Sequence, residues 1–199
     1  RGVEVIVVDG GSGDNTSVIA RELSDRVRAA PRGRATQMNA GAAVASGEAL
    51  LFLHADSQLP YQADDLVLSA LESSRWGRFD VRLSGSHHVF RIIETLMNLR
   101  SRLSRIATGD HGIFVKRDTF FAQGGYPEIE LMEDVALSKR LKRVGRPACL
   151  RQKILTSTRR WEEKGIMRTV VKMWILRLAY FLGASPQRLA RIYERQRGA

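Results

Sequence analysis

The sequence predicts an α/β protein with a mixed, mostly parallel sheet, and three observations lead to this fold class. Residues 3–8 form a β-branched run that is followed by a glycine-rich loop and a helix to about residue 23. Residues 49–53 are all apolar and lie between Gly47 and Pro60, which is typical of a short strand buried on both faces. Strand and helix patterns then alternate toward the C-terminus, as they do when helices connect the strands of one sheet.

Short polar side chains and an alanine-rich stretch place the next elements. Asn15, Thr16 and Ser17 can cap the first helix, because their oxygens accept hydrogen bonds from free backbone N–H groups. Residues 26–30 predict a second short strand. Residues 35–45 are rich in alanine and predict a helix that lies close to the sheet.

From residue 64 onward, the spacing of apolar residues decides between helix and strand. Residues 64–71 and 87–106 predict amphipathic helices, whereas residues 76–83 alternate between apolar and polar and predict a half-exposed strand. Residues 113–116 predict another strand, and residues 132–144 predict a helix whose first turn is acidic.

Length and composition favour one domain. The chain has 199 residues, of which 44% are hydrophobic, as in an ordinary soluble protein. Its single cysteine, Cys149, lies in a last expected short strand and excludes an internal disulfide, which favours a reducing, cytoplasmic compartment. The first residues lack the long apolar segment of a signal peptide. Because residue 3 already opens a strand, we expect that an upstream strand and helix are missing from this sequence.

The net charge of +11 is concentrated at the C-terminus. Residues 151–199 hold twelve Lys and Arg against three acids, which leaves +9 there and +2 in residues 1–150. Such a basic segment favours a phosphorylated substrate, an acidic membrane or a nucleic acid. Residues 166–182 predict a nearly all-apolar helix with three cations, too short and too charged to span a membrane. A buried helix, a homodimer contact and a helix at a membrane surface all remain open, and a last basic helix is expected from Pro186.

Polar residues follow two of the expected strands, where α/β proteins bind their ligands. His54 and Asp56 end the apolar strand and make a candidate site for a hard cation. The alternative is that Asp56 only caps the next helix. Asp9 follows the first strand in a loop that differs from a dinucleotide-binding loop, because Thr16 stands in place of the third glycine. A carboxylate there suits hydrogen bonds from a base or ribose, and the alternative is a tight turn capped by Asp9.

Charged residues at two helix starts are further candidates. Arg32 and Arg34 precede the alanine-rich helix, where a phosphate would meet both cations and free N–H groups. A solvated basic turn is the alternative. Glu133 and Asp134 open a later helix, and capping alone would explain them. Asp110 lies in a glycine-flanked loop of the kind that often carries function.

Three of these motifs occur in one order and resemble the family-two glycosyltransferases of the GT-A fold. They are Asp-Gly-Gly-Ser at 9–12, Phe-Leu-His-Ala-Asp at 52–56 and Leu-Met-Glu-Asp-Val at 131–135. The resemblance covers nearly the whole chain up to Trp161. It is nearest to a small bacterial subgroup labelled as arsenosugar-biosynthesis or selenium-associated glycosyltransferases.

The resemblance implies a domain organisation and a reaction. Residues 1–160 would form a domain of GT-A type, and the basic helices of residues 161–199 would pack on it. The family's first strand carries a nucleotide-contacting segment that is absent here, in line with the expected truncation. The implied reaction moves a sugar from a nucleotide-diphospho-sugar to an acceptor hydroxyl with inversion of configuration.

The resemblance also assigns roles to individual residues. His54-Ala55-Asp56 stands in place of the family's Asp-x-Asp metal motif, so Asp56, with His54, would bind Mn²⁺ or Mg²⁺. Asp134 matches the general base, with Glu133 beside it. The resemblance assigns nucleotide-sugar binding to Asp9, Gly10, Arg34, Asn39 and Asp56, and contact with the acceptor or diphosphate to Asp110, Arg160 and Trp161.

Two other functions fit parts of the same sequence. A nucleotidyltransferase also combines an α/β sheet with carboxylate-held Mg²⁺, but it would ordinarily need a Gly- and Lys-rich phosphate loop near its start. A non-enzymatic module could bind a membrane or a nucleic acid through the basic tail. Nucleic acid is disfavoured, because few aromatic residues interleave with the bases of the tail apart from Trp161 and Tyr193. The expected partners are therefore a nucleotide-sugar, an unidentified acceptor and, peripherally, the inner face of the cell membrane.

Overall fold

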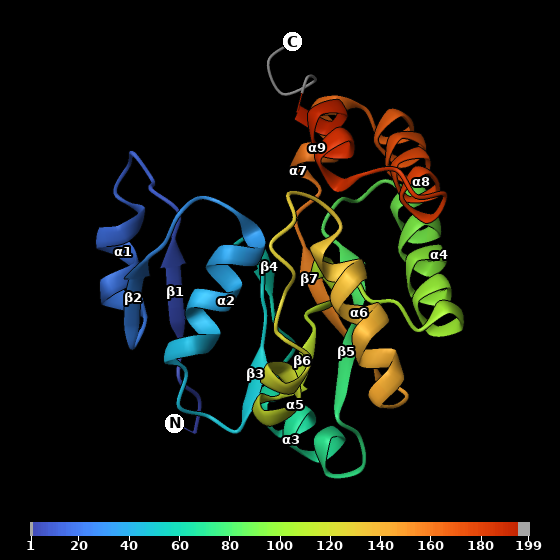
Figure 1. Cartoon of the computed structure of the whole chain (residues 1–199). Helices are drawn as coiled ribbons and strands as arrows, with labels where there is room; N and C mark the ends of the chain where they lie inside the picture. The colour runs from blue at the N-terminus through green and yellow to red at the C-terminus, as the bar shows by residue number, and fades with distance from the viewer. Residues whose placement is uncertain (1, 195–199) are drawn as a thin grey trace.

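The computed structural model describes residues 2–194, apart from the side chains of Arg160, Lys164 and Glu194. Helices surround two sheets, so the predicted α/β fold class is confirmed (Figure 1). No helix in the described range is long and apolar enough to cross a membrane.

The strands form one sheet of two strands and one of five. In the smaller sheet, β1 (Ile6–Asp9) and β2 (Arg26–Ala29) are parallel. The strands of the larger sheet are β3 (Ala49–Leu51), β4 (Ser57–Gln58), β5 (Trp76–Leu83), β6 (Phe114–Lys116) and β7 (Ala148–Thr156). Their order is β3-β6-β5-β7-β4, and β3, β5 and β7 share one direction while β6 and β4 run against it. Most strands of each sheet therefore run the same way, as the sequence predicted.

Helices cover both faces of the larger sheet. The helices are α1 (Thr16–Leu23), α2 (Arg34–Val44), α3 (Ala63–Ser73), α4 (His88–Ser104), α5 (Arg117–Ala122), α6 (Glu133–Val144), α7 (Arg159–Lys164), α8 (Ile166–Phe181), α9 (Pro186–Glu194) and the 3₁₀ turn η1 (Gly109–His111). Ala42 of α2 and Leu137 of α6 share a core cluster with Val115 of β6, whereas Val67 of α3 packs in another cluster with Phe114. Because neighbouring residues of a strand point to opposite faces, α2 and α6 cover one face and α3 the other.

Most predicted elements lie within a few residues of their expected bounds. The first strand begins at Ile6 rather than at residue 3, and the expected last short strand is the nine-residue β7. The strand β4 was not predicted, because two residues are too few for any periodicity to show. It pairs with β7 directly after Asp56 and so fixes the chain just beyond the candidate metal residue.

The strand β5 is not half-exposed, as its alternating pattern predicted, but buried at the centre of its sheet. Arg82 is its one exposed residue. The polar residues Arg78 and Asp80 form a buried ion pair, and Nη2 of Arg102 lies 2.7 Å from Asp80 as well. These charges offset one another inside the protein, so the polar residues of β5 can be buried. Their alternation with apolar residues therefore did not indicate an exposed face.

Side chains of α4 satisfy the backbone of β5 where β6 no longer pairs with it. Asn98 accepts a hydrogen bond from the N–H of Val81 at 2.8 Å and donates one to its carbonyl at 3.0 Å. Oε2 of Glu94 accepts the N–H of Leu83 at 3.0 Å. The helix α4 thus takes the place of a neighbouring strand along this part of β5.

The C-terminal helices α8 and α9 pack over the start of α6. Leu176 of α8 and Leu189 of α9 are buried in one cluster with Met132 and Val135, at the beginning of α6. On the opposite side of α8, Trp174 is 63% exposed. The helix therefore packs on the protein along one side and leaves apolar residues uncovered on the other.

We expect Asn98→Leu to lower the free energy of unfolding by about 2–4 kcal/mol, because it leaves the buried N–H and carbonyl of Val81 without partners. Urea unfolding measures this loss. Leu99→Ala, at the neighbouring exposed position of the same helix, is the control and should cost about 0.5 kcal/mol. Equal losses in the two variants would contradict the role given to Asn98.

Candidate active site

Segments that are far apart in the sequence meet beyond the end of β3. They are the N-terminal end of α2, the loop after β3, the turn η1 and the N-terminal end of α6. Three contacts join these segments, between Arg34 and Glu133, between His54 and Asp110, and between Gly109 and Asp134.

Asp134 is held by two backbone N–H groups. Its Oδ2 accepts the N–H of Gly109 at 2.8 Å, and its Oδ1 accepts the N–H of Val135 at 2.7 Å. In the first turn of α6 the helix dipole also favours its negative charge. Asp134 lines a cavity of about 40 Å³, which exceeds the ~10–15 Å³ that one water needs. Asp134 therefore caps the helix, as the alternative interpretation held, and also borders an open space.

Glu133 lines the same cavity as Asp134 but is almost fully buried. Its side chain is 3% exposed, and its Oε1 lies 3.7 Å from Nη1 of Arg34. Burial and the neighbouring charge of Asp134 raise the pKa of Glu133, against the lowering effect of Arg34. The guanidinium of Arg34 is the cation that this buried carboxylate contacts.

Arg34 begins α2 and keeps part of its guanidinium in solvent. Burial lowers the pKa of Arg34, but the negative charges of Glu133 and Asp134 outweigh that effect, so its pKa is raised. Its side chain remains 47% exposed. A cation at a helix N-terminus can bind an anion together with the N–H groups of the first turn.

The ring of His54 lies against η1. Its Nδ1 is 3.5 Å from Oδ1 of Asp110, and a Cβ at position 109 would overlap its Nε2, so a larger residue there would displace the ring. Burial raises the pKa of Asp110, but the hydrogen bond and charge of His54 outweigh it and lower the pKa to about 2. The hydrogen bond with Asp110 raises the pKa of His54, against the effect of burial. These two residues therefore favour a charged pair.

His111, next to Asp110, serves the fold rather than the site. It is wholly buried, and its Nδ1 lies 2.9 Å from Oγ1 of Thr108. Burial and the charges of Arg78 and Arg100 lower the pKa of His111 to about 3, so the imidazole is neutral.

Asp9 stabilises its own loop. Its Oδ1 accepts the hydroxyl of Ser12 at 2.6 Å, and its Oδ2 accepts the hydroxyl of Ser17 at 2.9 Å. These hydrogen bonds hold the pKa of Asp9 below its ordinary value. A Cβ at Gly10 would lie 3.0 Å from Gln37, whose Nε2 donates to a carbonyl of β1 at 2.9 Å. The tight-turn alternative for Asp9 is thus realised in this structure.

Three other residues have predicted roles. Two of them make contacts that stabilise the fold, and the side chain of the third is not described. Asn39 donates to the carbonyl of Tyr126 at 2.8 Å and accepts its N–H at 2.9 Å, and so holds that turn against α2. Trp161 packs against the cluster that contains Phe90. The side chain of Arg160 lies outside the described residues.

Asp56 is exposed and directly precedes β4. Within the described residues, no group of three His, Cys, Asp or Glu is placed to hold a metal ion. The part of the chain described here therefore builds no metal site from protein ligands alone. A Mg²⁺ or Mn²⁺ ion held by one carboxylate and the phosphates of a substrate fits this arrangement, because such ions often take most of their ligands from substrate and water.

The sequence did not identify two residues that lie near the site. Arg177 of α8 lines the same cavity as Asp134, together with Met173 one turn earlier. A cation inside an otherwise apolar helix was the available signal for Arg177. Gln37 bridges α2 and β1, but a single amide in an alanine-rich helix gave no signal.

A protein-family model matches residues 1–123, and it describes glycosyl transferase family 2. The match covers more than half of the chain. This chain belongs to glycosyl transferase family 2. Comparison of this family 2 member with curated protein sequences gives no match.

Solved structures share the fold of this family 2 glycosyltransferase domain. The S. aureus TarS 1–349 structure in complex with UDP is 18% identical with a TM-score of 0.62, over 77% of this chain and 51% of that chain. The mannosyltransferase PcManGT from Pyrobaculum calidifontis, in complex with GDP-Man and Mn²⁺, is 20% identical with a TM-score of 0.56, over 76% and 47%. These likenesses confirm the predicted GT-A architecture. The chain spans about half the length of these structures.

Proposed function

We propose that this family 2 glycosyltransferase moves a sugar from a nucleotide-diphospho-sugar to an acceptor hydroxyl, with inversion at the anomeric carbon. The observation that carries the proposal is the placement of Asp134, which the N–H of Gly109 orients at the border of an open cavity. Membership of this family also favours glycosyl transfer over nucleotidyl transfer.

The donor would lie between the loop after β1 and the N-terminal end of α2. The loop at Asp9 and Gly10 offers hydrogen bonds to a base or ribose, and Arg34 with the first N–H groups of α2 would bind the diphosphate. UDP in TarS and GDP-Man in PcManGT support a nucleoside diphosphate on this fold. The resemblance to the arsenosugar and selenium-associated subgroup stays a prediction about the acceptor.

In the proposed reaction, the acceptor hydroxyl attacks the anomeric carbon from the face opposite the diphosphate. A C–O bond to the acceptor forms as the bond between the anomeric carbon and the diphosphate oxygen breaks. The hydroxyl proton moves to Asp134, and the nucleoside diphosphate leaves with the electron pair of the broken bond. One such displacement inverts the configuration, and the base contributes ~10²–10⁴-fold in rate.

We assign the divalent metal to Asp56, together with the phosphates of the donor, and His54 stays a predicted second ligand. Bound there, Mn²⁺ or Mg²⁺ would act as a Lewis acid on the leaving diphosphate. The chain itself supplies an exposed carboxylate at Asp56, and the pairing of β4 with β7 fixes the backbone next to it.

We expect Asp134→Asn to lower turnover by ~10²-fold or more, because the amide cannot accept a proton. Its single oxygen keeps the hydrogen bond from only one of the two backbone N–H groups, that of Gly109 or that of Val135. Steady-state kinetics with a nucleotide-sugar panel measures the loss, and calorimetry should show unchanged donor binding. Glu130→Gln, at an exposed acid shortly before α6, is the control and should leave turnover unchanged. An active Asp134→Asn variant would reduce Asp134 to a helix cap.

We expect Asp56→Ala to abolish the effect of Mn²⁺ on the affinity for a UDP- or GDP-sugar while the fold stays intact, because Asp56 would be the protein's main metal ligand. Calorimetric titrations with and without Mn²⁺ measure this dependence. Asp65→Asn, at an exposed acid of α3, is the control. His54→Ala should weaken the Mn²⁺ effect only if His54 is a ligand. Unchanged metal dependence in Asp56→Ala would contradict the assignment.

We further propose that α4 and α8 contact an anionic membrane surface. The two helices touch, since Ile166 and Val170 of α8 pack against the cluster of Phe90 and Ile93 of α4. Both expose apolar side chains to about half their area or more. This exposed apolar patch consists of Ile92, Leu96, Leu99, Leu103, Met167, Val171, Trp174, Ile175, Leu178 and Leu182.

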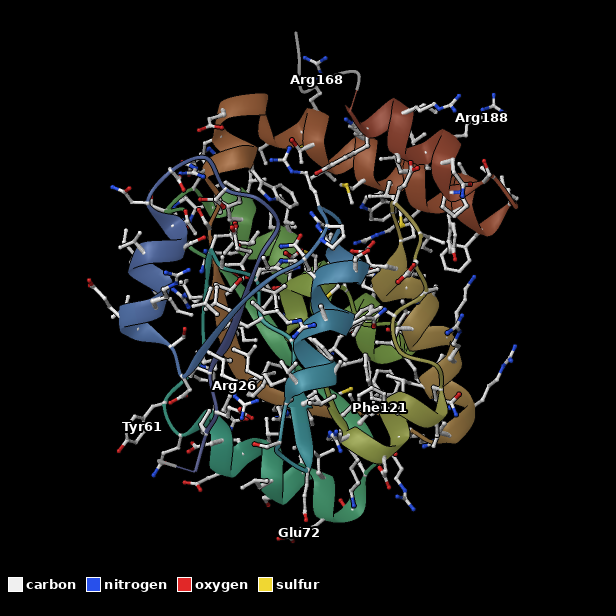
Figure 2. All side chains as sticks on the ribbon, turned by 60° about the vertical axis from the view of Figure 1, so that its left-hand side comes forward. Arg26, Tyr61, Glu72, Phe121, Arg168 and Arg188 are labelled. Atoms are coloured by element: carbon white, nitrogen blue, oxygen red, sulfur yellow. The ribbon has the colours of Figure 1, made fainter. Side chains whose placement is uncertain are left out.

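The charge near the exposed apolar patch favours lipid as its occupant. Arg168 and Arg188 are exposed at the outer edge of the C-terminal helices (Figure 2). An apolar helix face with an exposed Trp and flanking cations is typical of interfacial helices. Each cation near an anionic surface adds about 1 kcal/mol of attraction, which salt screens.

We expect the protein to sediment with anionic vesicles, to lose that binding as salt is added, and to ignore neutral vesicles. Trp174→Ser should weaken the binding, because it removes apolar area from the centre of the exposed patch. Tyr61→Ser, at an exposed aromatic residue far from the patch, is the control (Figure 2). A dimer that ignores both kinds of vesicle would assign the patch to a second copy of the chain.

A further inference from the structure

Two arginines beside Asp134 have buried nitrogen atoms without partners. Arg177 of α8 lines the cavity that Asp134 and Arg34 also border. Its Nε is buried and makes no hydrogen bond, and the same holds for Nη2 of Arg100 in α4. Among the described side chains, neither arginine has an acid within ion-pair distance. A buried polar group without a partner is costly, so such atoms mark a place where a ligand can supply one.

The two guanidiniums also repel each other. Burial lowers the pKa of Arg100 to about 10, and the positive charge of Arg177 contributes, with Asp134 opposing it. Arg78 adds a third positive charge, but Asp80 already pairs with it. The fold therefore keeps two poorly hydrated cations next to each other, and an anion between them would offset both the repulsion and the lost hydration.

The two arginines lie on the side of Asp134 that faces away from the proposed donor. The loop after β1 and α2 are at one side of the molecule, and α4 and α8 are at the other, with α6 between them (Figure 1). Arg34 reaches the cavity from α2, and Arg177 reaches it from α8. An acceptor that delivers its hydroxyl to Asp134 from the open side would place its other groups near Arg177.

We propose that Arg177 and Arg100 bind an acid group of the acceptor, either a carboxylate or a phosphate. This inference rests on the proposed function, because it takes Asp134 as the base for the acceptor hydroxyl. The cavity of about 40 Å³ has room for a head group of a few atoms and not for a whole sugar. Arginine suits such a group, because its planar fork donates two parallel hydrogen bonds to a carboxylate or phosphate.

The test compares glucuronate and glucose 6-phosphate with neutral glucose as probes, in calorimetric titrations without nucleotide. We expect the wild-type protein to bind at least one of the acids about tenfold more tightly than glucose or better, the effect of a charge-assisted hydrogen bond. The two acids distinguish carboxylate from phosphate. Arg177→Gln should abolish this preference, and Arg177→Lys should keep part of it, since lysine keeps the charge and loses the fork.

Arg168→Gln is the matched control, because it removes the same charge from an exposed position of the same helix (Figure 2). It should keep the preference for the acid. The melting temperature of Arg177→Gln should equal or exceed that of the wild-type protein, because the variant loses a half-buried cation whose Nε has no partner. A lower melting temperature together with an unchanged acid preference would make Arg177 a structural residue and overturn the proposal.

Titration with UDP and GDP in the presence of Mn²⁺ separates this inference from the proposed function. The proposal expects the affinity for the nucleoside diphosphate to be the same in Arg177→Gln and in the wild-type protein. Weaker nucleotide binding in Arg177→Gln would place Arg177 in the donor site and overturn the acceptor assignment. A wild-type protein that binds neither nucleotide contradicts the proposed function, whereas equal binding of glucose and both acids contradicts only the acceptor site.

Discussion

The buried carboxylate of Glu133 requires a cation beside it, and Arg34 supplies that cation from the other side of the site. With 3% exposure, Glu133 has lost most of its hydration, and the charge of Arg34, itself 47% exposed, offsets part of that loss. The pair therefore brings the start of α2 to the start of α6. Met132, which directly precedes Glu133, has a φ of 69°, an uncommon conformation for a residue with a side chain. The helix α6 begins directly after this turn, and its first two residues, Glu133 and Asp134, both line the cavity.

Positively charged side chains approach Asp134 from two sides of the molecule. Arg34 contacts Glu133 from α2, near the loop proposed to hold the donor, whereas Arg177 and Arg100 approach from α8 and α4 without forming an ion pair among the described side chains. The helix α8 has two distinct faces, with Arg177 lining the cavity and Trp174 exposed on the outside. One helix thus links the proposed acceptor site to the surface proposed to contact lipid.

The sequence predicted the elements better than it predicted their surroundings. Apolar runs and capping residues sufficed for most helices and strands, because these signals are local. The alternation in β5 was misleading, since Asp80 and Arg78 neutralise each other inside the protein, and this pairing depends on a contact that periodicity does not contain. Among site residues, the motif order led to Asp134 and Arg34, which do lie together. It could not show that Asn39 holds the turn at Tyr126, or that Arg177 arrives from a distant helix, because both facts depend on tertiary packing.

The stereochemistry of the product tests the central claim most directly, because a single displacement assisted by Asp134 has only one outcome at the anomeric carbon. The measurement is proton NMR of the reaction mixture during turnover of an α-linked nucleotide-sugar with Mn²⁺, following the coupling of the anomeric proton in the first product formed. The account predicts a β-linked product, or β-sugar if water is the acceptor. An α-linked first product would contradict it, since retention requires a second displacement or a different geometry of attack.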